Sequence, residues 1–208
     1  AQVVFCDLTA DDLGDTLDRF QTLPTVKGVR QIVGRAPGED AVTGTNALLD
    51  DPRFIEGLRE AGRRGFSFDL QLIPELYEQM GEILAEVPGT RVALCHAGSP
   101  HDRTPQGLAK WAKALRLLSN LNHVTCKLSG LGMFDHDWTP ETIRPIVETC
   151  LDQFEPARCM FGSNFPVDSL YSNYATIVAA YEALVPKAAK SAVFGETAAG
   201  FYDLTPAP

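Results

Sequence analysis

Six short apolar runs alternate with amphipathic segments along the chain, and this alternation constrains the fold more strongly than any other feature of the sequence. The runs are four to eight residues long and rich in β-branched and aromatic residues, which favours strands over helices. They occupy residues 3–6, 26–33, 66–72, 91–96, 123–129 and 158–162. Because strands that alternate with helices are joined by crossovers, the sequence predicts a parallel sheet.

The segments between the runs carry helix start signals. In several of them, an Asp or Thr whose side chain can accept a hydrogen bond from a free N–H group is followed directly by a proline, which suits the first helical turn. Helices are expected to begin near Thr9, Asp51, Pro74, Thr104 and Thr139. Two further helical segments are expected at residues 173–185 and 187–194. An open doubly wound sheet and a (β/α)8 barrel both fit this order, but the absence of G-x-G-x-x-G and Walker patterns weakens a dinucleotide-binding version of the first.

Composition narrows the class of protein and its partners. A chain of 208 residues, 45% hydrophobic and 22% charged, suits a single globular domain over residues 1–208. The net charge of −9, without clustered Lys and Arg, argues against nucleic-acid binding, and no apolar run approaches the roughly 20 residues that cross a bilayer. The five cysteines are odd in number and lack a C-x-x-C pair, and most lie in apolar runs. This usage favours packing in a reducing compartment, so we expect a cytoplasmic protein.

Polar side chains stand at the carboxyl end of every predicted strand. They are Asp7, Arg30, Gln31, Asp69, Gln71, His96, Lys127, Ser129, Ser163 and Asn164, with Asp168 just beyond. In both candidate architectures ligands bind at this edge of the sheet, so a shared pocket is expected there. A Pro/Gly-rich stretch, residues 35–50, is a candidate cover for it.

His96 is the strongest candidate for chemistry. It ends a strand and is followed by a turn fixed by Gly98 and Pro100, although a strand-end histidine can also be structural. Neither G-x-S-x-G nor H-E-x-x-H occurs, which argues against serine hydrolase and zincin chemistry. His123 and His136 are expected mainly outside the site.

The basic residues at the strand ends have competing roles. Arg103 suits a substrate carboxylate, and a role in solvent is equally compatible. Lys127 is a candidate for neutralising an anion, or it lies along the surface with its charge in water. For Arg30, ligand binding competes with a buried pairing to Asp7 or Asp69.

Five motifs resemble, in order, the amidohydrolase-related proteins of the amidohydrolase superfamily. They are KGVRQ (27–31), SFDLQL (67–72), HAGSPHDR (96–103), CKLSGLGMF (126–134) and CMFGSNFPVD (159–168). That group includes hydrolases of sugar lactones, sulfomuconolactone and pyrone dicarboxylate. The resemblance implies a (β/α)8 TIM-type barrel that hydrolyses a lactone or similar carbonyl ester at its carboxyl-end mouth.

The resemblance also implies roles for individual residues. His96 matches the strand-end histidine of the family, and Asn164 matches a position where many members carry an aspartate that acts as a base or holds a metal. The catalytic candidates are therefore His96, Asn164 and Asp168. The substrate-binding candidates are Arg30, Gln71, Arg103, Lys127 and Ser129. A divalent metal, zinc or manganese, is optional, with His96 as its candidate ligand.

The chain departs from the family pattern in two ways. It opens with Ala-Gln-Val-Val, and no His-x-His strand precedes Val3. Because a closed barrel needs eight strands, we expect that an N-terminal strand–helix portion is missing from this chain. The second departure is Asn164, whose neutral amide is not a useful base. Asp168 is expected on the rim of the pocket, and it substitutes only if the turn at Pro166 folds it back.

These observations predict a hydrolase of a small anionic lactone or similar ester. Two alternatives stay open: a non-catalytic relative that binds small molecules, and a metal-dependent decarboxylase of the same superfamily. The expected partner is a small-molecule substrate, without nucleic acid or membrane, and a homo-oligomer is compatible with the composition.

Overall fold

One parallel sheet organises the molecule. The computed structural model describes residues 1–37 and 46–204. Its six strands are hydrogen-bonded in sequence order, and each neighbouring pair is parallel, as predicted. The strands are β1 (Gln2–Phe5), β2 (Val26–Ile32), β3 (Ser67–Gln71), β4 (Val92–Leu94), β5 (Val124–Leu128) and β6 (Cys159–Phe161).

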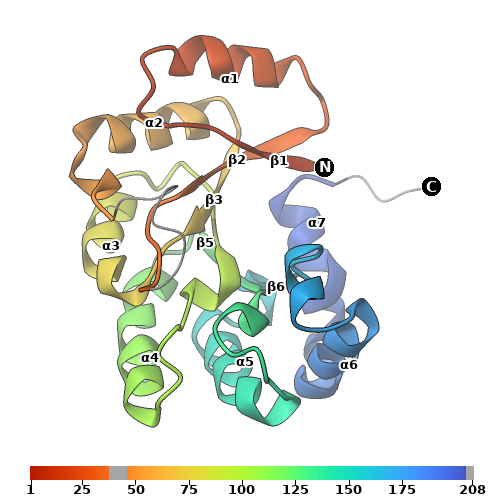
Figure 1. Ribbon diagram of the computed structural model, residues 1–208. Coiled ribbons are helices and arrows are strands. Elements are labelled where there is room, and N and C mark those ends of the chain that lie inside the picture. Colours follow the sequence, from red (N-terminus) through yellow and green to blue (C-terminus); the bar gives the residue numbers. More distant parts are fainter. Residues whose placement is uncertain (38–45, 205–208) are drawn as a thin grey trace.

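Helices follow the strands and lie on the outer side of the curved sheet (Figure 1). They are α1 (Leu13–Gln21), α2 (Pro52–Arg63), α3 (Tyr77–Ala85), α4 (Pro105–Ser119), α5 (Pro140–Phe154) and α6 (Tyr174–Leu184). A seventh helix, α7 (Thr197–Phe201), follows α6, and its Phe201 packs with Ala93 and Met160 in a cluster separate from the main core. The arrangement is that of a partial (β/α)8 barrel. Within the described residues, β1 and β6 each have one strand neighbour. The same residues contain no helix with both the length and the apolar character needed to cross a membrane.

Three of the predicted helix starts are confirmed by their caps. The Asp51 side chain accepts a hydrogen bond from the Arg53 N–H, and the Thr104 side chain accepts one from the Gly107 N–H. At α5, Thr139 takes part in a reciprocal capping box. These caps satisfy N–H groups that the first helical turn leaves without intrahelical partners.

Two starts lie later than predicted. Thr9 does not cap α1, because both its backbone N–H and its hydroxyl donate to Asp7 Oδ1, at 3.0 and 2.7 Å. The chain therefore makes a local turn before α1, whose N-cap is Asp12. At Pro74 the chain first forms a 3₁₀ turn, and α3 begins at Tyr77.

The core lies between the sheet and the helices. Every residue of β3 is buried, and so are the inward faces of the neighbouring helices. All five cysteines are buried and free, as predicted for the four that lie in apolar runs. Fully buried helix residues include Phe54 and Leu58 of α2, Met80 and Leu84 of α3, and Leu115 and Leu118 of α4.

The C-terminal segment is tied to the interior of the sheet by Tyr202. Its helix extends beyond the predicted 187–194 into α7, and the Tyr202 hydroxyl then donates to Asp69 Oδ1 at 2.7 Å. Asp69 Oδ2 pairs with the Lys127 ammonium, which also lies 5.2 Å from the centre of the Tyr202 ring. Arg91 adds a hydrogen bond of 2.7 Å to the Phe201 carbonyl. The Asp69 carboxylate, 2% exposed, is therefore paired with an ammonium group from β5 and hydrogen-bonded by a tyrosine of the C-terminal segment.

Candidate active site

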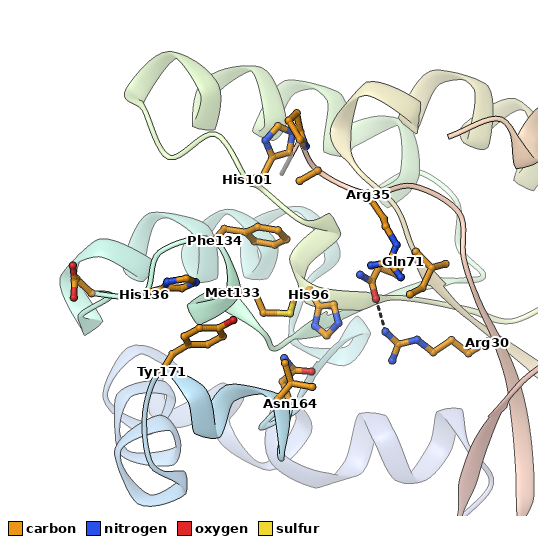
Figure 2. A pocket seen from close by; sticks show the side chains of 15 residues that line it. Arg30, Arg35, Gln71, His96, His101, Met133, Phe134, His136, Asn164 and Tyr171 are labelled. Carbon is orange, nitrogen blue, oxygen red and sulfur yellow. Dashed lines mark hydrogen bonds between the residues drawn. The ribbon is translucent and has the colours of Figure 1, made fainter. Parts of the chain in front are cut away.

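A cavity of about 950 Å³ opens at the carboxyl ends of the strands. Its wall comes from the ends of β2 and β3 and from the loops after β2, β4, β5 and β6. Figure 2 shows Arg30, His96 and Asn164 directed towards the same space. Strand-end residues thus converge as parallel topology requires, which is the placement that the sequence predicted.

Four of the eight predicted site residues line this cavity. They are Arg30, Gln71, His96 and Asn164. The Arg30 guanidinium donates a hydrogen bond to Gln71 Oε1, which fixes both side chains at adjacent strand ends. The expected alternative, a pairing of Arg30 with Asp7 or Asp69, does not occur among the described residues, where Asp69 pairs with Lys127.

The other four lie behind the cavity wall. Lys127 is engaged with Asp69, so its charge is already paired. Ser129 is buried, and its Oγ lies 3.0 Å from His96 Nδ1. Arg103 donates to the Leu131 carbonyl at 2.8 Å, and its Nε and Nη1 are buried without hydrogen-bond partners among the described residues. Burial lowers the pKa of this guanidinium. Its placement therefore gives no support to contact with a substrate carboxylate.

Asp168 also differs from its expected place on the rim. It is 4% exposed, and its Oδ1 accepts a hydrogen bond of 2.7 Å from Asn164 Nδ2. Asp168 also lines a small void, together with apolar residues and Tyr181. The turn after β6 folds Asp168 back, but behind Asn164 and out of the cavity lining.

His96 stands in a left-handed turn. The φ angles of His96, Ala97, Gly98 and Ser99 are 56°, 51°, 71° and 56°, a conformation that costs free energy for residues other than glycine. Two buried aromatic donors hold this turn in place. The Trp111 indole donates to the Ala97 carbonyl at 3.0 Å, and the Tyr77 hydroxyl donates to the Gly98 carbonyl.

The space beside the His96 ring also depends on Gly130. A Cβ at that position would lie 2.4 Å from His96 Nδ1, closer than real Cβ atoms approach. Gly130 has a φ of 61°, so both its conformation and its contact favour glycine. The left-handed turn of the motif HAGS (96–99) and the glycine of KLSG (127–130) therefore both determine the position of the His96 ring.

The His96 imidazole is neutral at neutral pH. Burial lowers its pKa to about 3, and the positive charges of Arg30 and Lys127 act in the same direction. A hydrogen bond with Ser129 opposes the shift without reversing it. Because Nδ1 faces Ser129, Nε2 is the ring nitrogen left for the cavity.

Several cavity residues were not predicted for the site. Met133 and Phe134 line one side, and His136 and Tyr171 stack with ring centres 4.1 Å apart. His136 was expected outside the site, and the correction follows from the loop after β5, which folds over the strand ends. The clustered aromatic residues of FDHDW (134–138) and of the segment around Tyr171 were the sequence signal that could have indicated these cavity residues.

The described residues that line the cavity include charged groups of both signs. Arg30 and Arg35 are among these residues, and so is the carboxylate of Asp137. His101 also lines it, and its Nε2 lies 3.1 Å from the Glu75 carboxylate. Arg35 belongs to the predicted cover, of which residues 38–45 lie outside the described residues.

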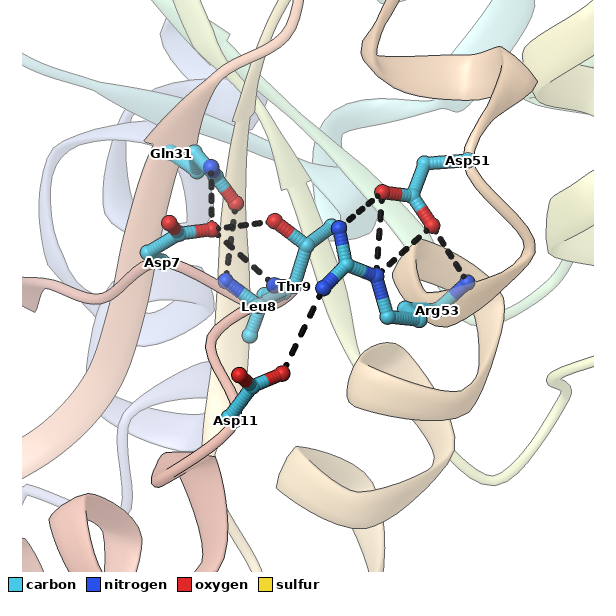
Figure 3. A network of polar contacts seen from close by, with 7 residues as sticks. All are labelled: Asp7, Leu8, Thr9, Asp11, Gln31, Asp51 and Arg53. Carbon is cyan, nitrogen blue, oxygen red and sulfur yellow. Dashed lines mark hydrogen bonds and ion pairs between the residues drawn. The ribbon is translucent and has the colours of Figure 1, made fainter.

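The carboxyl end of β1 contributes to a separate surface network. Asp7, expected at the shared pocket, accepts hydrogen bonds from Thr9 and from Gln31 Nε2, the latter at 3.1 Å (Figure 3). Nearby, Asp51 pairs with Arg53 at 2.7 Å. None of these five residues lines the cavity formed by the described part of the chain.

Comparison with known proteins settles the family. The family model described as amidohydrolase matches residues 1–204. The chain belongs to this amidohydrolase family. An uncharacterized protein from Sinorhizobium fredii is 35% identical over 204 residues, which cover 96% of this chain and 68% of the relative. An L-fucono-1,5-lactonase from Burkholderia multivorans is 34% identical over 173 residues, covering 76% of this chain and 58% of that enzyme.

Solved amidohydrolase structures share the fold. A Burkholderia multivorans amidohydrolase crystallised with bound zinc superposes with a TM-score of 0.86 at 28% identity, covering 98% of this chain and 73% of the other. The family assignment makes this chain an amidohydrolase-related hydrolase. The described residues form six parallel strands of this barrel fold.

The described residues of this amidohydrolase do not form a complete metal site. Among residues 1–37 and 46–204, no group of three or more His, Cys, Asp or Glu side chains is arranged to hold a metal ion. Catalytic zinc commonly takes three protein ligands, whereas His96 is a single buried imidazole beside two cationic side chains. This donor set does not fit a metal, so no reaction step is assigned to one.

Proposed function

We propose that this amidohydrolase hydrolyses a small lactone that carries negative charge. The observation that supports this best is the cavity itself, which brings a neutral His96 together with Arg30 and the Asn164 amide. The lactonase relative from Burkholderia multivorans supports the choice of a cyclic ester. Arg30 supports an anionic substrate, because it lines the cavity and donates a hydrogen bond to Gln71, which is uncharged.

In the proposed reaction, His96 Nε2 takes a proton from water as the water oxygen attacks the lactone carbonyl. The ring C–O bond then breaks, and the alkoxide leaving group receives the proton from Nε2, which yields a hydroxy acid. Asn164 orients the water through its amide. Arg30, held by Gln71, binds the negative charge of the substrate and of the tetrahedral intermediate.

Substrate charge also affects the strength of the base. A histidine whose pKa lies at about 3 is a weak proton acceptor, and Arg30 contributes to that low value. An anion bound against Arg30 cancels part of this positive field, so the pKa of His96 rises when substrate is present. The substrate thereby helps to activate the base that attacks it.

The test is a panel of lactones with and without a carboxylate, assayed with and without added Zn²⁺ or Mn²⁺. We expect hydrolysis with a preference for charged lactones, and a loss of about 100- to 10,000-fold in kcat/KM on His96→Asn. His123→Asn is the matched control, because His123 directly precedes the first residue of β5, whereas the cavity lies at the carboxyl ends of the strands. Absence of turnover across the panel, or a fully active His96→Asn variant, contradicts the proposal.

A further inference from the structure

Asn164 and Asp168 form a pair in which only one member reaches the cavity. Asn164 lines it, whereas Asp168 is 4% exposed and lies behind. The Asn164 Nδ2 donates to Asp168 Oδ1 at 2.7 Å. Both residues belong to one tight turn, since the Asp168 N–H donates to the Asn164 carbonyl at 3.1 Å.

The chemistry of this hydrogen bond fixes which way the amide points. An ionised carboxylate only accepts hydrogen bonds, so the Asn164 group that faces it must be the NH₂. The amide oxygen, on the other branch of the same planar group, then points away from Asp168. Without the carboxylate, the two ends of the amide would have no such preference.

We propose that Asp168 is a positioning residue that holds the Asn164 amide with Oδ1 towards the cavity, where it accepts a hydrogen bond from the attacking water. This inference rests on the proposed hydrolysis. It explains how a site with the Asn164 amide in the cavity still uses a carboxylate. The Asp168 carboxylate lies behind Asn164 and acts through its hydrogen bond to the amide.

The surroundings of Asp168 support a fixed orientation. Tyr171 and Ser172 donate their backbone N–H groups to the Asp168 carbonyl, at 3.1 and 2.9 Å, which anchors the turn. Asp168 lines a small void together with Leu131, Ile143 and Tyr181, and at 4% exposure it has little access to water. This burial raises the pKa of Asp168, and the hydrogen bond from Asn164 opposes that rise by favouring the carboxylate.

The first variant is Asp168→Asn, which keeps the shape of the side chain. The new amide can donate to Asn164 Oδ1, so the fixed orientation is lost. We expect kcat to fall roughly 10- to 100-fold with little change in KM, because a misdirected group near the reacting atoms disturbs the transition state more than binding. The control Ser169→Ala lies in the same turn, where its exposed hydroxyl donates to the Pro166 carbonyl, and should leave kcat unchanged.

The second variant exchanges the two groups. Asn164→Asp alone places two carboxylates at hydrogen-bonding distance, and their repulsion should lower activity. The double variant Asn164→Asp/Asp168→Asn restores the hydrogen bond with its direction reversed and puts a carboxylate oxygen in the cavity. We expect its kcat to exceed that of each single variant by at least about tenfold. A double variant no better than the singles, or an unchanged kcat for Asp168→Asn, overturns the proposal.

A readout without turnover separates this inference from the proposed function. In the NMR spectrum, the Asn164 side-chain NH₂, identified by its loss in Asn164→Asp, should shift and exchange faster with water in Asp168→Asn than in Ser169→Ala. If that change occurs but no lactone is hydrolysed, the positioning stands and the proposed reaction fails. If lactones are hydrolysed and both kcat and the NH₂ signal are insensitive to Asp168→Asn, the positioning fails alone.

Discussion

Neutral, buried His96 links the stability of the protein to pH. Its ring is 5% exposed and lies near the charges of Arg30 and Lys127, so protonation is unfavourable in the folded state. In the unfolded chain the same imidazole takes a proton near its ordinary pKa of 6.5. The folded pKa is the lower one, so this contribution to stability is present above pH 6.5 and is lost as pH falls towards 3.

His96→Gln should therefore change the pH dependence of unfolding. Urea denaturation of both proteins between pH 7 and pH 4 gives the difference in their free energies of unfolding. We expect the wild type to lose stability relative to the variant as pH falls below 6.5, with a slope approaching 1.4 kcal/mol per pH unit, roughly the free energy of one proton. A pH-independent difference would contradict a buried neutral imidazole.

At the scale of elements, α3 and α4 hold the left-handed turn after β4. Tyr77 lies on α3 and donates a hydrogen bond from its hydroxyl to the Gly98 carbonyl. Trp111 lies on α4 and donates one from its indole N–H to the Ala97 carbonyl. The turn carries His96, so packing of the two helices determines where the ring stands. Such a backbone conformation persists only when surrounding contacts outweigh its cost.

Tyr77→Phe tests this arrangement with little change in volume. It leaves the buried Gly98 carbonyl without its side-chain donor, so we expect a loss of about 1–3 kcal/mol in the free energy of unfolding and a lower kcat. Tyr181→Phe is the matched control, because that buried hydroxyl has no partner among the described residues. Its effect should be smaller in urea denaturation. Equal losses for both variants would remove the case for a specific role of Tyr77.

At the scale of the whole molecule, the C-terminal segment closes the interior around Asp69. Tyr202, 8% exposed, reaches β3 from a position 133 residues later in the chain. The Asp69 carboxylate is thereby shared between a phenol and the Lys127 ammonium. A buried charge of this kind is tolerated only when it is paired and hydrogen-bonded.

Tyr202→Phe should lower the free energy of unfolding by about 1–3 kcal/mol, since Asp69 loses a buried hydrogen bond. Tyr174→Phe, at a position 54% exposed, should change it by less than about 0.5 kcal/mol. Thermal or urea unfolding of the three proteins makes the comparison. A Tyr202→Phe variant as stable as the wild type would show that the C-terminal tie contributes nothing.

Much of the architecture followed from local patterns. The period and length of the apolar runs predicted all six strands, and the caps at Asp51, Thr104 and Thr139 predicted three helix starts. These signals are local because hydrogen bonding within an element and burial of one face depend on neighbouring residues. Parallel topology then placed the strand ends at one edge, which is why Arg30, Gln71, His96 and Asn164 could be predicted near one another.

Tertiary structure alone decided which partner each polar group has. Lys127, rather than Arg30, neutralises Asp69; Asp168 turns behind Asn164; and the loop after β5 brings His136 to the cavity. Such choices depend on the curvature of the sheet and the paths of loops, which bring together residues far apart in sequence. The sequence determined the strands, the helices and the edge where a site could form, because those depend on local periodicity. The three-dimensional packing decided which charges remain available in that site, because pairing depends on distances that no local pattern contains.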